Sequence, residues 1–199
     1  KLTPRVEALK IGPYTSGVDV DFGPVVTAAA KQSILGLIDT GVKDGADLVV
    51  DGRDFNLQGY ENGFFVGACL FDNVTTEMDI YKKEIFGPVL SAVRAQSYEE
   101  AIGMAMDHEY GNGTAIFTRD GDAARDFANR INVGMVGVNV PIPVPLAYHT
   151  FGGWKKSAFG DLNQHGPDAF KFYTRTKTVT SRWPSGTKEG ADFSIPTME

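Results

Sequence analysis

The sequence is poor in the residues that build disulfide frameworks and metal sites. It contains one cysteine, Cys69, and three histidines, His108, His149 and His165. A single cysteine cannot form a disulfide framework, and the histidines are not spaced as metal ligands. We therefore expect no bound metal, and we assign none of the histidines a role. Scarce cysteine is typical of a reducing compartment.

The sequence also lacks an excess of positive charge and a long apolar run. It has 19 basic and 25 acidic residues, a net charge of −6, whereas affinity for nucleic acid depends largely on Lys and Arg. The most apolar stretch, 133–148, is interrupted by Asn139 and by prolines, so it is too short and too broken to span a bilayer. We expect no nucleic-acid partner and no membrane partner.

The remaining composition is that of an ordinary globular protein with a buried core. Apolar residues recur with helical spacing in segments that follow candidate caps, and short apolar runs typical of strands lie between these segments. Strands that alternate with amphipathic helices are typical of βαβ units, so we predict an α/β fold with a mainly parallel sheet flanked by helices. The expected helices span 27–42, 97–107 and 120–131, and the expected strands 47–50, 64–71, 88–95, 114–118 and 135–140.

The C-terminal part follows a different pattern. Residues 170–182 alternate β-branched and long polar side chains, which predicts an exposed strand. Such an edge favours pairing with another chain, and we weigh this against pairing within the chain itself.

Cys69 is the obvious candidate for a nucleophile, but its neighbours in 64–71 are apolar. A reactive thiol needs an electropositive, partly exposed site. We therefore interpret Cys69 as a core residue.

The segment 82–88 places a carboxylate, an aromatic ring and a Gly-Pro turn just before a strand. Glu84 could accept hydrogen bonds from a ribose diol, and Phe86 could pack on a flat ring, because junctions of this kind often line ligand crevices. The alternative is a solvated glutamate and a core phenylalanine. General physical chemistry alone favours that alternative.

A second unusual segment carries three alternating prolines over 141–145 and then Phe151-Gly152-Gly153. The prolines enforce an extended backbone, and the glycines allow close approach of another backbone. A rigid apolar wall or a simple crossover loop would both fit this pattern.

Four further motifs follow one another along nearly the whole chain. They are Glu-Ile-Phe-Gly-Pro-Val at 84–89, Tyr-Gly-Asn-Gly-Thr-Ala-Ile-Phe-Thr at 110–118, Phe-Gly-Gly-Trp-Lys-Lys-Ser at 151–157 and Tyr-Thr-Arg-Thr-Lys-Thr-Val-Thr at 173–180. Each is weak alone, but in this order they resemble the NAD(P)-dependent aldehyde dehydrogenase superfamily. The loop 136–146, Val-Gly-Val-Asn-Val-Pro-Ile-Pro-Val-Pro-Leu, is similar to the CoA-acylating methylmalonate-semialdehyde dehydrogenase branch.

The resemblance implies roles for three residues. Glu84 matches the glutamate that binds the nicotinamide ribose, and Phe86 matches the aromatic residue beside that ribose. Phe151 matches an aromatic residue close to the substrate and nicotinamide end of the pocket. Residues 143–146 would shape substrate specificity, whereas Lys155, Lys156 and Ser157 match a structural motif.

The resemblance also implies a reaction. A cysteine thiolate attacks a semialdehyde, hydride passes to NAD⁺, and coenzyme A takes the acyl group from the resulting thioester. Methylmalonate semialdehyde would yield propionyl-CoA after decarboxylation, and malonate semialdehyde acetyl-CoA. The nucleophile of the family would lie upstream of Lys1, so we expect no catalytic residue of this kind here and no turnover by this chain alone.

We accordingly divide the chain into three parts: 1–169, a partial catalytic domain without the nucleophile segment; 170–183, an oligomerisation strand; and 184–199, a tail. We expect the parent enzyme to be a homo-oligomer of the cytoplasm or mitochondrial matrix, because any targeting segment would precede Lys1. Two alternatives stay open. One is a non-acylating aldehyde dehydrogenase, and the other is a non-catalytic α/β module that assembles through its edge strand.

Overall fold

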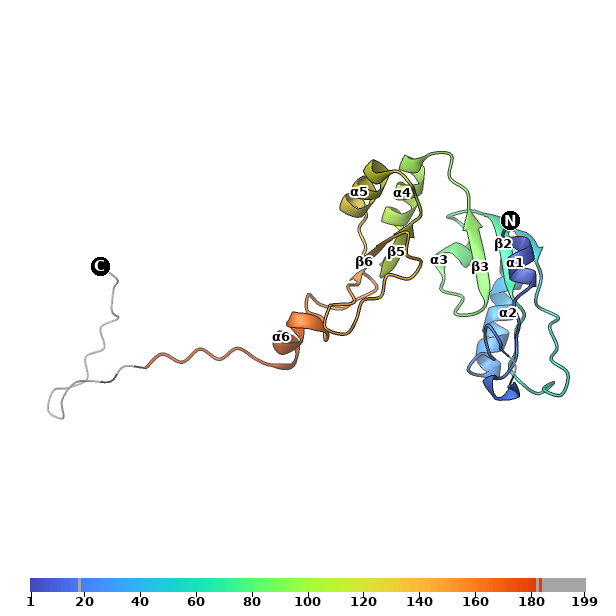
Figure 1. The fold of residues 1–199 in the computed structure, drawn as a ribbon, viewed down its shortest axis with the longest axis horizontal. Coiled ribbons are helices and arrows are strands. Elements are labelled where there is room, and N and C mark those ends of the chain that lie inside the picture. Colours follow the sequence, from blue (N-terminus) through green and yellow to red (C-terminus); the bar gives the residue numbers. More distant parts are fainter. Residues whose placement is uncertain (18, 182, 184–199) are drawn as a thin grey trace.

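The structure is a computed structural model that describes residues 1–17, 19–181 and 183. The chain forms two lobes in succession, and residues 174–181 extend away from the second lobe (Figure 1). The helices are α1 (Thr3–Glu7), α2 (Ala28–Lys43), α3 (Asp79–Lys82), α4 (Tyr98–Asp107), α5 (Gly121–Arg130) and α6 (Ala169–Tyr173), with 3₁₀ turns at Tyr14–Ser16 and Gly166–Asp168. The strands are β1 (Asp47–Val50), β2 (Cys69–Val74), β3 (Val89–Val93), β4 (Tyr110–Gly111), β5 (Gly113–Ile116), β6 (Met135–Val138) and β7 (Trp154–Lys155).

The first lobe packs α2 against a sheet of order β1-β2-β3. Ile34 and Ile38 of α2 are fully buried, and they join Phe71 and Cys69 of β2 in one core. Burying a large aliphatic or aromatic side chain contributes about 1.5–3 kcal/mol. This core therefore fixes α2 on the sheet.

The second lobe packs α4 and α5 beside the parallel pair β5–β6 (Figure 1). Its core consists of Ile102 from α4, Phe127 from α5, and Ile131 and Val133 from the connection to β6. The two lobes thus have separate clusters of buried side chains.

Side-chain caps begin the helices where the sequence predicts them. Thr27 Oγ1 accepts the Ala30 N–H at 3.0 Å, and Ser97 Oγ accepts the Glu100 N–H at 3.1 Å. Each bond satisfies one of the N–H groups that a helix leaves free at its first turn. The predicted helices are confirmed as α2, α4 and α5.

The α/β class is confirmed, but the sheet is divided. The described strands form three sheets; the β2–β3 and β5–β6 pairs are parallel, and the β1–β2 and β4–β7 pairs are antiparallel. Helix α4 connects β3 to β5 as in a βαβ unit, yet these two strands do not pair. A cavity of about 470 Å³ is lined by Val93 of β3, Met104 of α4 and Thr114 of β5. In the described residues the parallel pairs β2–β3 and β5–β6 thus belong to separate sheets.

The strand predicted over 64–71 begins later than expected, at Cys69. Gly67 instead donates its N–H to the Gly52 carbonyl oxygen at 3.0 Å. A Cβ atom on Gly67 would lie within 2.6 Å of the Gly52 backbone. This close crossing holds the preceding residues out of the β2–β3 ladder.

The prediction of a strand over 170–182 is wrong at its start. Residues 169–173 form α6, and 174–181 have no strand partner in the described chain. A β-prone sequence forms a strand only where a neighbouring strand accepts its hydrogen bonds, and α6 continues instead from the Gly166–Asp168 turn. Residue 182 and the expected tail, 184–199, lie outside the described residues.

Among the helices of the described residues, none combines the length and the apolarity needed to cross a membrane. The longest, α2, contains Lys31, Asp39 and Lys43 within its sixteen residues.

Candidate active-site surface

The turn between α3 and β3 carries Glu84. Ile85 packs against the core of the first lobe. At Gly87 an added Cβ would lie 2.7 Å from the Cδ1 of Ile34, so only glycine fits there without displacement. With Ile85 and Gly87 held inward, Glu84 stays exposed and lines a surface hollow of about 490 Å³.

Phe86 occupies an unusual position in this turn. Its backbone is left-handed, with φ of 56°, and its ring is 80% exposed. A left-handed conformation costs a non-glycine residue roughly 1–2 kcal/mol, and an exposed phenylalanine returns no burial energy. Within the described residues Phe86 is therefore not part of the core, contrary to the alternative interpretation.

Positive side chains surround the hollow at Glu84, and each has an acidic partner. Lys83 pairs with Asp79 at 2.6 Å, and Lys156 pairs with Glu109 at 2.5 Å. The hydrogen bond from Lys156 lowers the pKa of the Glu109 carboxyl below its ordinary value. These pairs compensate the charge around Glu84 but leave its carboxylate available.

His108 also lines this hollow, but its ring is engaged in local structure. Its Nδ1 accepts the Tyr110 N–H at 3.2 Å, so Nε2 carries the proton and donates it to the Tyr81 carbonyl oxygen at 3.2 Å. Both ring nitrogens are therefore used. This arrangement supports a structural role for His108.

Phe151 lies on a loop that is fixed by a backbone crossing. Gly152 and Gly153 have φ of 68° and 106°, and both lie against Gly134 at the entry to β6. A Cβ on Gly134 would be 1.7 Å from the Gly153 nitrogen, which no side chain tolerates. The predicted close approach at these glycines is confirmed. The Phe151 ring stacks on His165, with centroids 4.3 Å apart.

The proline-rich loop leaves β6 through Asn139. This residue, at φ of 58°, accepts the Thr118 N–H through Oδ1 at 2.9 Å and donates Nδ2 to the Thr118 carbonyl oxygen at 3.0 Å. These two hydrogen bonds hold the start of the loop against the residues that follow β5. Beyond it, Ile142, Val144 and Leu146 are all exposed.

The motif after Phe151 has the structural role that the resemblance implies. Lys155 Nζ donates to the carbonyl oxygens of Met106 at 2.6 Å and His108 at 2.9 Å, at the C-terminus of α4. Ser157 Oγ accepts the Gly111 N–H at 3.0 Å. These contacts join β7 to the second lobe.

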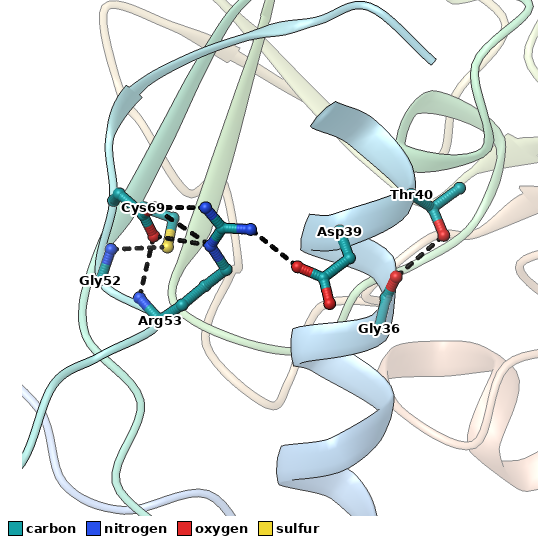
Figure 2. Close-up of polar contacts among 7 residues, drawn as sticks. Gly36, Asp39, Thr40, Gly52, Arg53 and Cys69 are labelled. Atoms are coloured by element: carbon teal, nitrogen blue, oxygen red, sulfur yellow. Dashed lines mark hydrogen bonds and ion pairs between the residues drawn. The ribbon is translucent and has the colours of Figure 1, made fainter. Parts of the chain in front are cut away.

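Cys69 is confirmed as a core residue, with 1% of its surface exposed. Figure 2 shows its sulfur beside the Gly52 N–H, at 3.2 Å, and Arg53 reaching Asp39 of α2. Burial raises the pKa of the Cys69 thiol above its ordinary value. The thiolate is thus disfavoured. In the described chain, no group of three or more His, Cys, Asp or Glu residues could hold a metal ion.

The three predicted site residues occupy different surroundings. Glu84 lines the hollow, whereas neither Phe86 nor Phe151 does, and Phe151 contacts His165 instead. Their convergence on one ligand stays a prediction. His165 has no role predicted from the sequence, and no spacing rule links it to Phe151. The left-handed backbone of Phe86 could not be predicted from the sequence either, because a phenylalanine is not a residue that favours this conformation.

The α/β fold and these motifs are those of an aldehyde dehydrogenase. The model of the aldehyde dehydrogenase family matches residues 1–179, so the protein belongs to this family. It is 60% identical over all 199 residues to the malonate-semialdehyde dehydrogenase of Pseudomonas aeruginosa, of which it covers 40%. It is 49% identical over 183 residues, 92% of the chain, to the acylating, mitochondrial methylmalonate-semialdehyde dehydrogenase of Arabidopsis thaliana, of which it covers 30%.

A solved structure is also similar. It is a Sinorhizobium meliloti 1021 protein described as a methylmalonate-semialdehyde dehydrogenase and complexed with NAD. The TM-score is 0.89 at 73% identity, over 94% of this chain and 38% of that one. The chain thus spans about two fifths or less of the length of each of these relatives.

Proposed function

We propose that this chain forms part of the catalytic portion of an NAD-dependent, CoA-acylating semialdehyde dehydrogenase, which oxidises malonate or methylmalonate semialdehyde to an acyl-CoA. The 60% identity to the Pseudomonas aeruginosa malonate-semialdehyde dehydrogenase over the whole chain carries this proposal. The similar Sinorhizobium meliloti structure contains NAD, which supports the cofactor. The relative from Arabidopsis thaliana is named as acylating, which supports transfer of the acyl group to an acceptor, and coenzyme A is the acceptor that we propose.

Within this function, Glu84 accepts hydrogen bonds from the hydroxyls of the nicotinamide ribose. Its exposed carboxylate on a rigid turn suits that task. Phe86 packs against the ribose and the adjoining ring. Ligand contact would recover burial energy that the exposed ring lacks in the chain alone.

Phe151 lines the substrate and nicotinamide end of the same site, and the exposed side chains within 143–146 form its outer wall. The prolines of this loop restrict its backbone, so the wall needs little ordering when substrate binds. Residues 174–181 would pair with another subunit of a homo-oligomer, because they are β-prone and unpaired within the described chain.

A chimera tests the proposal. This 199-residue sequence replaces the matching segment of the Pseudomonas aeruginosa enzyme. We expect NADH formation from malonate semialdehyde, with acetyl-CoA as product when coenzyme A is present. The unaltered Pseudomonas aeruginosa enzyme is the positive control.

Two results would contradict the proposal. A folded chimera without NADH formation would remove the chain from this catalytic function. Release of the free acid at the same rate with and without coenzyme A would instead assign it to a non-acylating aldehyde dehydrogenase.

A further inference from the structure

The ring of His165 packs on Phe151 and has no role in the proposed function. It lies parallel to Phe151, with the ring planes 24° apart and the centroids separated by 4.3 Å. Both side chains are only partly exposed. One face of the Phe151 ring is therefore covered by an aromatic neighbour from a segment fourteen residues further along the chain.

The backbone next to His165 is also fixed against the Phe151 loop. Gly166 has φ of 69°, and a Cβ there would lie 2.9 Å from the Thr150 nitrogen and 3.1 Å from the His149 carbonyl carbon. Only glycine at position 166 therefore allows this segment to lie so close to the backbone of His149 and Thr150. Pro167 comes next, at the start of the Gly166–Asp168 turn, and restricts the backbone further.

Phe151 is thus held from two sides. Its own backbone leads into the Gly152–Gly134 crossing, and its ring rests on His165, which Gly166 holds in place. A side chain held by packing and by its neighbours keeps the geometry that an active site needs.

We propose that His165 is a positioning residue that sets the orientation of the Phe151 ring and thereby shapes the substrate end of the pocket. This inference rests on the proposed function of Phe151. His165 itself needs no contact with the semialdehyde or with NAD⁺. A flat ring at position 165 is sufficient, because the contact is made by stacking.

The experiment uses the chimera with four variants: His165→Leu, His165→Phe, Phe151→Ala and the control His149→Leu. The control makes the same change at an exposed histidine that contacts Tyr148 rather than Phe151. For His165→Leu we expect the kcat/KM for semialdehyde to fall roughly 3- to 10-fold, because this factor corresponds to the interaction free energy of an aromatic pair. The KM for NAD⁺ should stay unchanged. His165→Phe should restore most of the loss, and His149→Leu should have no effect.

The outcomes separate this inference from the proposed function. If Phe151→Ala lowers kcat/KM but His165→Leu does not, His165 has no positioning role and the function of Phe151 stands. If Phe151→Ala has no effect, the proposed role of Phe151 fails, and the positioning role fails with it. If His165→Phe is as impaired as His165→Leu, a specific property of imidazole is required and stacking is overturned.

A second measurement covers the case in which His165→Leu does not fold. A stacked ring shields protons over its face, so the His165 ring protons should resonate upfield in the NMR spectrum of this chain. Phe151→Leu should shift them downfield, and Phe159→Leu, at a ring that is 97% exposed, should not. Identical His165 resonances in all three proteins would overturn the contact.

Discussion

The ammonium group of Lys155 lies 2.6 Å from the carbonyl oxygen of Met106, at the C-terminus of α4. The last carbonyl groups of a helix have no partner within the helix and carry partial negative charge. Lys155 also donates to the His108 carbonyl oxygen. Its left-handed backbone, with φ of 53°, brings the side chain back across the chain to reach them.

Replacing Lys155 by methionine removes these bonds but keeps most of the apolar stem. We expect the free energy of unfolding of this chain to fall by about 1.5–3 kcal/mol, the range for hydrogen bonds to a charged group. Urea denaturation followed by circular dichroism measures the loss. Lys156→Met is the matched control, because its surface pair with Glu109 is solvated and should matter less. Equal losses in the two variants would contradict the capping role.

The crossing of Gly134 with Gly152 and Gly153 should tolerate no side chain. Gly134→Ala places a Cβ 1.7 Å from the Gly153 nitrogen, so the backbones must separate. We expect a loss of at least about 3 kcal/mol in unfolding free energy. Gly36→Ala is the control, because nothing lies within 4 Å of the added Cβ in α2. That variant should gain about 0.5–1 kcal/mol. A thermally stable Gly134→Ala protein would show that the backbones do not cross closely.

Cys69 should react slowly with a disulfide reagent in the folded chain. Burial raises its thiol pKa, so at pH 8 the folded protein holds less thiolate than an unfolded chain does. The rate of labelling should rise with pH through a higher range than that of a free cysteine, and urea should abolish the difference. Ellman's reagent provides the measurement. Stoichiometric labelling of folded protein within the time taken by a model thiol would contradict the buried position.

Phe86→Gly should separate stability from cofactor binding. Glycine adopts a φ of 56° without strain, and the lost ring is 80% exposed. We expect the unfolding free energy of the chain to stay unchanged or to rise by up to about 1 kcal/mol. In the chimera, the same variant should raise the KM for NAD⁺. A destabilised chain with unaltered KM would mean that Phe86 serves the fold and not the cofactor.

The local patterns of the sequence were sufficient for the three longest helices, α2, α4 and α5, and for most strands. Thr27 and Ser97 cap the helices that follow, because capping depends only on residues within one turn. The late start of β2 depends on Gly67 meeting Gly52, a contact between distant parts of the chain that no local pattern reports. The division of the parallel strands between two sheets also depends on pairing between segments distant in the sequence, which local patterns do not report.

The candidate site was predictable only in part. The motif at 84–89 identified Glu84 and Phe86 through resemblance. The left-handed backbone of the exposed Phe86 is known only from the structure. For residues 170–173, β-propensity was misleading, because the 3₁₀ turn before them continues as α6. The stacking of His165 on Phe151 follows from loop packing at Gly166, which sequence spacing does not encode.

The most direct measurement of the central claim is the affinity of the chimera for NAD⁺ when Glu84 is replaced by glutamine. The change keeps the size of the side chain and removes the charge that strengthens hydrogen bonds to the ribose. We expect the KM for NAD⁺ to rise, or the hydride step to slow, by about tenfold, while Glu77→Gln, at an exposed glutamate paired with Lys82, has no effect. Unchanged KM and hydride rate in a folded Glu84→Gln chimera would show that this chain does not hold the ribose.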